Sequence, residues 1–235
     1  GACTVQDALL AARQLGYPLV LKGEHGFAGQ QVCICHNESD LVNSHRQMSG
    51  ASPALHIDAQ QYIRGTTAMC AGVAKEGRLL ESVFALKLHT HPLPTSPCSV
   101  AGFANDDSAR HILASLVQCL GFNGFCSCDV MVESETNDVY LLEFNPRPVP
   151  LTALGHLDGH DLCAAYAQTI GNAPAVAGAE QTPKSTPERQ AVVAFFPNEW
   201  LRDANSPYLL NAYHDVPWDD PPLLRATINA VVKPL

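Results

Sequence analysis

The sequence lacks any long apolar segment and any cluster of basic residues. No apolar run reaches the ~20 residues of a membrane-spanning helix, and the first residues enter a predicted helix without a signal-peptide pattern. Lysine and arginine number 14 against 23 aspartate and glutamate residues, which gives a formal net charge of −9. This charge offers no general attraction to nucleic acids or anionic membranes. We therefore expect a soluble, cytoplasmic protein without nucleic-acid or membrane partners, in which a few placed groups hold any anionic ligand.

The nine cysteines also lack the spacing of a small disulfide-bonded domain, which favours reduced thiols. Two C-x-C pairs, Cys33 with Cys35 and Cys126 with Cys128, leave zinc binding as an alternative. Both pairs lie in β-like runs without the turn glycines of a zinc knuckle, so we interpret them as small buried hydrophobic side chains.

A second candidate metal pair is the H-x-H formed by His89 and His91 beside Pro92. The spacing fixes no third ligand, and we therefore favour a proline-rich loop over residues 89–97.

With 46% hydrophobic residues, the chain can bury a core, either as one domain of two lobes or as one domain with an appendage. It begins at Gly1 without a methionine, and we expect a fragment or a processed form. Thr4 and Asp7 predict a capping box that opens a helix over about residues 4–15.

Periodicity and turn signals predict the remaining elements. Further helices are expected near residues 39–47, 106–120 and 161–170, and strands are expected at residues 17–22, 31–35, 54–63, 67–74, 79–88 and 124–143, the last range as a hairpin. The stretch 171–187, rich in alanine, glycine, proline and threonine, indicates a linker, and a β run opens the last segment.

The most informative segment is VYLLEFNPRP at residues 139–148, where an apolar β-like run ends in Glu143, Asn145 and Arg147 at alternate positions. Alternate side chains of a strand share one face. Carboxylate and amide oxygens are ligands that Mg²⁺ or Mn²⁺ prefers, and a guanidinium suits phosphate or carboxylate. The pattern therefore indicates a site for a divalent metal and an anion; the alternative is a hairpin edge with solvated acids.

A second carboxylate is needed, because one alone rarely holds Mg²⁺. Asp129 lies on the preceding run, and the turn at residues 134–138 would bring it beside Glu143. The two acids would then bridge one or two metals that neutralise a triphosphate.

Three weaker signals precede this hairpin. Lys22 ends an apolar strand and is followed by a loop with Gly23, Gly26 and Gly29, which is compatible with a phosphate clamp or with a solvated lysine in a turn. Gln60, Gln61, Tyr62 and Ile63 end another β run before Gly65, where extended backbone could read an adenine edge. Lys87 ends a further strand and could reach a γ phosphate or be solvated.

The order of these features, strand-end lysine, glycine hairpin, Q-Q-Y-I-x-G and E-x-N-x-R, resembles the ATP-grasp family over about residues 4–171. The most similar members are the ATP-binding halves of carbamoyl phosphate synthetase and biotin carboxylase. The resemblance implies an α+β fold in which two lobes with antiparallel sheets enclose ATP. It implies a small lobe at 1–63, a large lobe at 64–171, a linker at 172–189 and a C-terminal appendage at 190–235.

The resemblance also implies roles for the candidate residues. Lys22 would contact the α or β phosphate, residues 23–30 with Gly26 and Gly29 would form the phosphate lid, and Gln60, Gln61, Tyr62 and Ile63 would form the adenine hinge. Asp129, Glu143 and Asn145 would hold Mg²⁺ or Mn²⁺, and Arg147 would stabilise the transferring phosphoryl group or the acyl phosphate. Lys87 is a second candidate catalytic residue on the strength of its strand-end position alone.

The implied activity is that of an ATP-dependent carboxylate–amine ligase, or of a ligase similar to carbamoyl phosphate synthetase, working through an acyl phosphate. Its partners would be small carboxylate and amine substrates, with a homodimer or a missing N-terminal domain left open. The missing ribose-binding Glu after Gly65 and the absent N-terminal domain favour an alternative, a nucleotide-binding regulatory or structural module without ligase activity. Two departures from the family pattern would also lower the affinity for ATP. Thr66 and Thr67 follow Gly65 where many members have a ribose-binding Glu, and Gln30 follows Gly29 where a basic residue is common.

Overall fold

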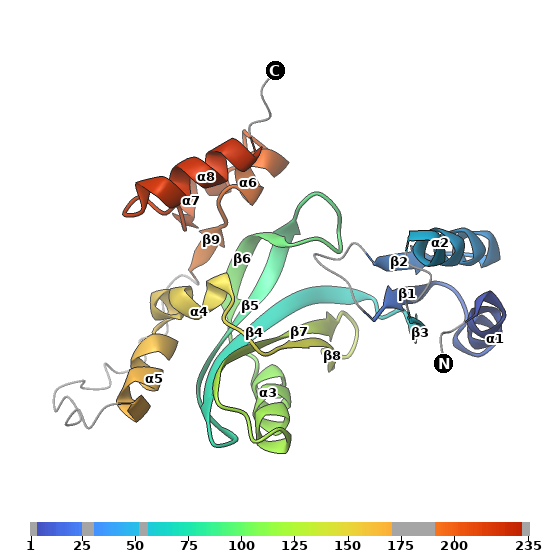
Figure 1. Cartoon of the computed structure of the whole chain (residues 1–235), viewed down its shortest axis with the longest axis horizontal. Helices are drawn as coiled ribbons and strands as arrows, with labels where there is room; N and C mark the ends of the chain where they lie inside the picture. The colour runs from blue at the N-terminus through green and yellow to red at the C-terminus, as the bar shows by residue number, and fades with distance from the viewer. Residues whose placement is uncertain (1–3, 25–30, 52–55, 171–190, 232–235) are drawn as a thin grey trace. The chain divides into compact units, whose positions relative to one another are not determined.

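The computed structural model of the chain describes residues 4–24, 31–51, 56–170 and 191–231, and their contacts form two compact units (Figure 1). The first unit contains the chain up to residue 64 together with residues 92–97. The second contains residues 65–91 and the chain from residue 98 onward. Each unit is described below by itself.

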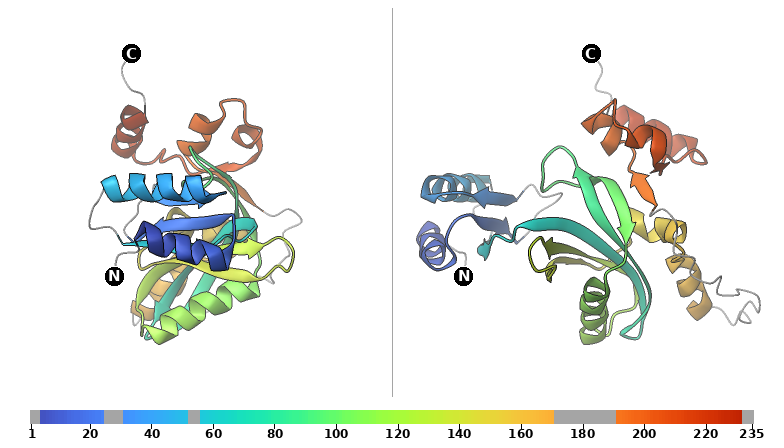
Figure 2. Two further views of the ribbon diagram at one scale, coloured as in Figure 1. Left: turned by 90° about the vertical axis from the view of Figure 1, so that its right-hand side faces the viewer. Right: turned by 180° about the vertical axis from the view of Figure 1, so that it is seen from behind.

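The first unit is a three-stranded antiparallel sheet covered by two helices. Strand β1 (Leu19–Gly23) lies between β2 (Val32–Cys35) and β3 (Ile57–Gln61). Helices α1 (Val5–Leu15) and α2 (Glu38–Ala51) contact each other and the sheet (Figure 2). Burial alternates along β1, because Leu19 and Leu21 belong to the core under the helices whereas Val20 and Lys22 occupy the other face.

The predicted start of α1 is confirmed. The Thr4 side chain accepts a hydrogen bond from the Asp7 backbone N–H, and the Asp7 carboxylate accepts one from the Thr4 backbone N–H. This reciprocal pair satisfies two of the donors that a helix N-terminus leaves without an intrahelical partner.

The second unit is built on a seven-stranded sheet with the order β10-β9-β6-β5-β4-β7-β8. Adjacent strands are antiparallel except for the short β9–β10 pair, which is parallel. The strands are β4 (Gly65–Lys75), β5 (Arg78–Thr90), β6 (Cys98–Ala104), β7 (Gly124–Glu133), β8 (Val139–Asn145), β9 (Val192–Ala194) and β10 (Tyr213–His214).

Helices cover both faces of this sheet, as the right-hand view of Figure 2 shows. On one face, α3 (Asp107–Cys119) packs Leu113 and Val117 over a cluster that includes Cys126, Cys128 and Val130. On the other face, α4 (Pro150–Leu154), the 3₁₀ helix η1 (Gly155–Asp158) and α5 (Leu162–Ile170) cover a second cluster that contains Ala71, Val83 and Ala85. Strands β4 and β5 therefore send alternate residues into two different cores.

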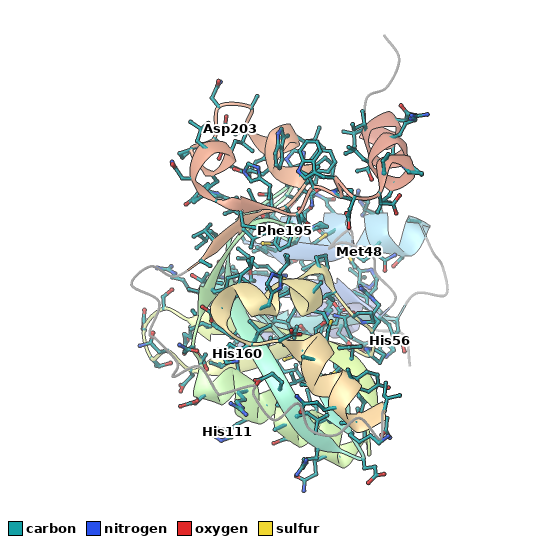
Figure 3. All side chains as sticks on the ribbon, turned by 90° about the vertical axis from the view of Figure 1, so that its left-hand side faces the viewer. Met48, His56, His111, His160, Phe195 and Asp203 are labelled. Atoms are coloured by element: carbon teal, nitrogen blue, oxygen red, sulfur yellow. The ribbon has the colours of Figure 1, made fainter. Side chains whose placement is uncertain are left out.

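A polar contact joins the η1–α5 connection to the sheet. His160, labelled in Figure 3, has its Nδ1 3.1 Å from Oε1 of Glu81 on β5. The hydrogen bond from His160 lowers the pKa of Glu81, and a second hydrogen bond from the Ser82 backbone N–H lowers it further. Partial burial raises this pKa, but the hydrogen bonds outweigh it. Glu81 thus stays ionised beside the apolar cluster and anchors the helical segment.

The described part of the C-terminal segment adds strands and short helices to the second unit. After β9 come α6 (Asn198–Arg202), α7 (Tyr208–Asn211), β10 and α8 (Pro221–Val231). Strand β9 pairs with β6, so the segment extends the seven-stranded sheet. Within the ranges described, no helix has the length and apolar character to cross a membrane.

Most predicted elements are confirmed, including the 124–143 hairpin, α3 and α5. Three differ. Strand β5 continues to Thr90 and includes His89, which had been assigned to the loop. Strand β8 ends at Asn145, because Pro146 has no N–H for the ladder. Helix α8 was not predicted, although Asp220 before Pro221 is a helix-start signal. The predicted linker at 172–189 lies outside the described residues.

Candidate metal and phosphate site

The predicted pairing of the two acids is confirmed. In the β7–β8 ladder Asp129 lies directly opposite Glu143, and Ser127 lies directly opposite Asn145. Directly opposed residues of an antiparallel pair have Cβ atoms ~5 Å apart and on the same face. Asp129, Glu143 and Asn145 therefore present three oxygen-bearing side chains to one side of the sheet.

A β-bulge separates this polar face from the apolar start of β8. Asp129 pairs with Glu143 and the next residue, Val130, pairs with Leu141, so Leu142 is an extra residue on β8. Without the bulge, Val139, Leu141 and Glu143 would share a face. With it, Val139 packs in the cluster under α3 while Glu143 lies opposite Asp129 on the other face.

Phe144 fixes the orientation of Glu143 and Asn145, the residues on either side of it. It lies opposite Cys128, packs in the cluster under α3, and its ring meets that of Phe122 edge-on at a centroid distance of 5.7 Å. Since neighbours along a strand point to opposite faces, an anchored Phe144 holds Glu143 and Asn145 on the polar face. The bulge and this anchor were not predicted, because four consecutive apolar residues at 139–142 give no alternation from which to infer a register.

Lys87 lies on the same polar face. Met69 of β4 is opposite both Asp129 on β7 and Ala85 on β5, and Lys87 is two residues beyond Ala85. The Lys87 ammonium reaches across β4 to Asp129, with Nζ 3.0 Å from Oδ1. The side chains are 14% and 31% exposed respectively, so the ion pair is largely shielded from water. Lys87 is thus ion-paired with Asp129 and largely buried, so the alternative of a solvated lysine is wrong, and its predicted contact with a phosphate stays a prediction.

Arg147 departs from the expected geometry. The predicted alternation of Glu143, Asn145 and Arg147 along one strand is wrong at its last position, because the strand ends at Asn145. The Arg147 backbone N–H donates to the Asn145 carbonyl at 2.9 Å, which turns the chain toward α4. Its exposed guanidinium follows the ligand strand directly, but strand periodicity does not set its direction.

Three cysteines of the sheet, Cys98, Cys126 and Cys128, are buried. Burial raises the pKa of Cys98 to about 12, although the charge of Lys87 opposes this change, and the thiol donates to the Val100 carbonyl at 3.1 Å. Cys126 and Cys128 are buried under α3, as predicted for small hydrophobic side chains. In the ranges that the structure describes, no three or more His, Cys, Asp or Glu side chains form a metal-binding group.

The remaining candidates belong to the first unit. Lys22 lies opposite Asp58 on β3, and Gln60 lies opposite Val20, so Lys22 and Gln60 share the sheet face that α1 and α2 leave uncovered. Gln61 lies opposite Leu19 and therefore belongs to the other face. Tyr62 and Ile63 follow the end of β3. Gly26 and Gly29 lie outside the described residues.

Comparison with known protein families finds no matching family model. Among curated proteins, the chain is 30% identical over 158 residues to the carbamoyl phosphate synthase large chain of Xylella fastidiosa strain 9a5c. The match covers 62% of this chain and 14% of that relative, so the chain spans about one seventh of the relative's length.

Two solved structures with similar folds contain bound adenine nucleotides. The biotin carboxylase domain of Hydrogenobacter thermophilus 2-oxoglutarate carboxylase, in complex with MgADP, ADP and bicarbonate, matches 70% of this chain and 39% of its own at TM-score 0.56 and 17% identity. N5-carboxyaminoimidazole synthetase from Staphylococcus aureus, complexed with ADP, matches 65% of this chain and 40% of its own, with a TM-score of 0.52 and 17% identity. These likenesses confirm the predicted fold.

Proposed function

Since the chain has the ATP-grasp fold, we propose that it binds Mg·ATP as part of a ligase that phosphorylates a carboxylate and passes the acyl group to an amine. The observation that carries this proposal is the pairing of Asp129 with Glu143, with Asn145 and Lys87 on the same sheet face. This face carries two carboxylates, an amide and an ammonium group. Such a set suits a metal-bound triphosphate better than it suits a metal ion alone or a triphosphate alone.

The residues fit a magnesium ion that is held jointly with phosphate. Mg²⁺ is usually bound through one or two carboxylates together with substrate phosphates and water, and seldom by an all-protein cage. Asp129 and Glu143 supply two carboxylates at opposed positions, and Asn145 supplies an amide oxygen two residues from Glu143. When bound there, Mg²⁺ would offset the negative charge of the β and γ phosphates.

The site lies beside an apolar cluster. Met69, which sits between Asp129 and Ala85 in the ladder, packs against the buried cluster that contains Ala71 and Ala85. A neighbouring apolar region lowers the local dielectric constant, so fixed charges act more strongly on a transferring phosphoryl group. Arg147, which directly follows the ligand strand, would stabilise the charge on the γ phosphoryl group during transfer.

In the proposed reaction, a carboxylate oxygen of the substrate attacks the γ phosphorus and the bond to the β–γ bridging oxygen breaks. ADP leaves with that electron pair, and the acyl phosphate then loses inorganic phosphate when an amine attacks its carbonyl carbon. Bicarbonate is the alternative first substrate.

An alternative function is nucleotide binding without ligation. It is favoured by Thr66 and Thr67 on β4, where a ribose-binding carboxylate is common in similar proteins. The alternative predicts Mg²⁺-dependent nucleotide binding with no phosphate release in the presence of any carboxylate.

Calorimetric titration of a non-hydrolysable ATP analogue, with and without Mg²⁺, tests the proposal. Glu143→Gln should remove most of the magnesium-dependent gain in affinity, whereas Glu135→Gln, an equal change of charge in the exposed β7–β8 turn, should not. Wild-type protein that fails to bind the analogue under either condition would refute the nucleotide site.

Measurement of phosphate release from ATP, in a screen of carboxylates and bicarbonate, distinguishes a ligase from a nucleotide-binding module without ligase activity. Arg147→Ala should keep analogue affinity within about threefold while abolishing turnover, because it removes charge stabilisation specific to the transferring group. A variant that loses analogue binding but retains turnover would contradict this role for Arg147.

A further inference from the structure

The ion pair between Lys87 and Asp129 occupies one of the carboxylates proposed for metal binding. Lys87 Nζ lies 3.0 Å from Asp129 Oδ1, and the lysine side chain is only 14% exposed. Lys87 comes from β5 and Asp129 from β7, with β4 between them in the sheet. The lysine stem therefore lies along the sheet surface, and its ammonium belongs to the same polar face as Glu143.

A cation cannot use Asp129 without changing this pair. The ammonium and a divalent metal compete for the same carboxylate oxygens and repel each other at close range. A metal that displaced Lys87 would leave a largely buried ammonium without a counter-charge, which is a costly arrangement. Metal alone should therefore bind poorly, even though Glu143 and Asn145 are positioned for it.

A triphosphate removes this obstacle, because it supplies other anionic oxygens for the lysine. We propose that Lys87 is an exchangeable counter-ion that couples the two ligands of the site. Without nucleotide, Lys87 neutralises Asp129; with nucleotide, Lys87 donates to a phosphate oxygen and Asp129 becomes available to the metal. The inference rests on the proposed function and adds to it the order in which the site is completed.

This role predicts opposite effects of one substitution on two ligands. Lys87→Met should tighten binding of Mn²⁺ alone by about tenfold or more, since one nearby positive charge and one competitor are removed. The same substitution should weaken binding of the ATP analogue measured in EDTA, because the phosphate loses its donor. Loss of packing would weaken both ligands, and a solvated lysine without a role would change neither.

The experiment measures Mn²⁺ alone by the electron paramagnetic resonance signal of the free ion, and the analogue in EDTA by calorimetry. Lys87→Arg keeps the charge and should retain both wild-type affinities within a few-fold. Lys75→Met makes the same change of charge on an exposed residue at the far end of β4 and should alter neither. The double variant Lys87→Met with Asp129→Asn should lose the gain in Mn²⁺ affinity.

The outcomes separate this inference from the proposed function. The exchange is supported if Lys87→Met binds Mn²⁺ more tightly and the analogue more weakly than wild type. The gain in Mn²⁺ affinity should then disappear when Asp129→Asn is added. Unchanged Mn²⁺ affinity, or a parallel loss of both ligands in Lys87→Met while Lys87→Arg remains normal, would overturn it. If the wild-type protein binds no Mg·analogue while remaining folded by circular dichroism, the proposed function itself fails.

Discussion

Replacement of Glu199 by glutamine tests how the C-terminal segment is held to the second unit. Glu199 on α6 is fully buried, and its two carboxylate oxygens accept hydrogen bonds from Arg202 Nη2 at 2.6 Å and Nε at 2.7 Å. The same helix contacts β6, where the Asn198 amide donates to the Cys98 carbonyl at 3.3 Å. The paired charges therefore lie at the junction between the segment and the sheet.

The magnitude follows from the pKa of Glu199. Burial raises this pKa, but hydrogen bonds from Arg202 and Ser206 outweigh it and bring the value to about 2, against an ordinary 4.5. The difference of about 2.5 corresponds to ~3 kcal/mol of stability at neutral pH, at 1.36 kcal/mol for each pH unit. Because the folded pKa is the lower one, this contribution is complete above pH 4.5 and is lost as the pH falls toward 2. By pH 3.5 about 1 kcal/mol should already be gone.

Urea unfolding followed by tryptophan fluorescence measures the effect, since both tryptophans, Trp200 and Trp218, lie in this segment. The free energy of unfolding of Glu199→Gln should be lower than that of wild type by ~3 kcal/mol at pH 7. At pH 3.5 this difference should shrink by about 1 kcal/mol. The exposed Glu135→Gln serves as the control for charge alone. A wild-type-minus-variant difference that stays the same at both pH values would refute the assignment of this stability to the ionised pair.

Two further predictions concern backbone packing and thiol chemistry. A Cβ at Gly65 would collide with the Val132 carbonyl oxygen, so Gly65→Ala should destabilise the protein by about 2–4 kcal/mol in urea unfolding. Gly50→Ala on α2, where no atom lies near the added methyl group, should stabilise the protein by about 0.5–1 kcal/mol. Equal effects of the two substitutions would contradict the β4–β7 register. Burial raises the pKa of Cys98 and of Cys126 to about 12, so iodoacetamide at pH 8 should modify the exposed Cys119 and Cys163 well before either, as peptide mass spectrometry can show.

The parts of the fold that were predicted correctly depend on local signals. The capping residues Thr4 and Asp7 identify the start of α1, and the polar turn at residues 134–138 sets the length of the hairpin that brings Asp129 opposite Glu143. Both depend on contacts a few residues apart, which a sequence expresses directly. The assignment of Mg²⁺ and phosphate roles to these residues stays a prediction that the proposed titrations test.

The parts that were not predicted depend on strand order. Lys87 meets Asp129 only because β4 lies between β5 and β7, and the sequence separation of the two residues gives no sign of this arrangement. Glu199 also looks like an ordinary acid at the surface of a short helix, until the packing of α6 on β6 makes it fully buried. Long-range pairing decides both cases, and periodicity within one segment cannot report it.

The bulge at Leu142 connects the fold to the proposed chemistry. An edge strand must bury one part against α3 and present ligands on the opposite face, yet Val139 and Glu143 are an even number of residues apart and would share a face in a regular strand. One extra residue resolves this conflict, because Val139 stays in the apolar cluster while Glu143 and Asn145 face Asp129. The geometry that we propose for metal binding on β8 therefore depends on an insertion of a single residue, and Phe144 is the anchor that keeps Glu143 and Asn145 on the polar face.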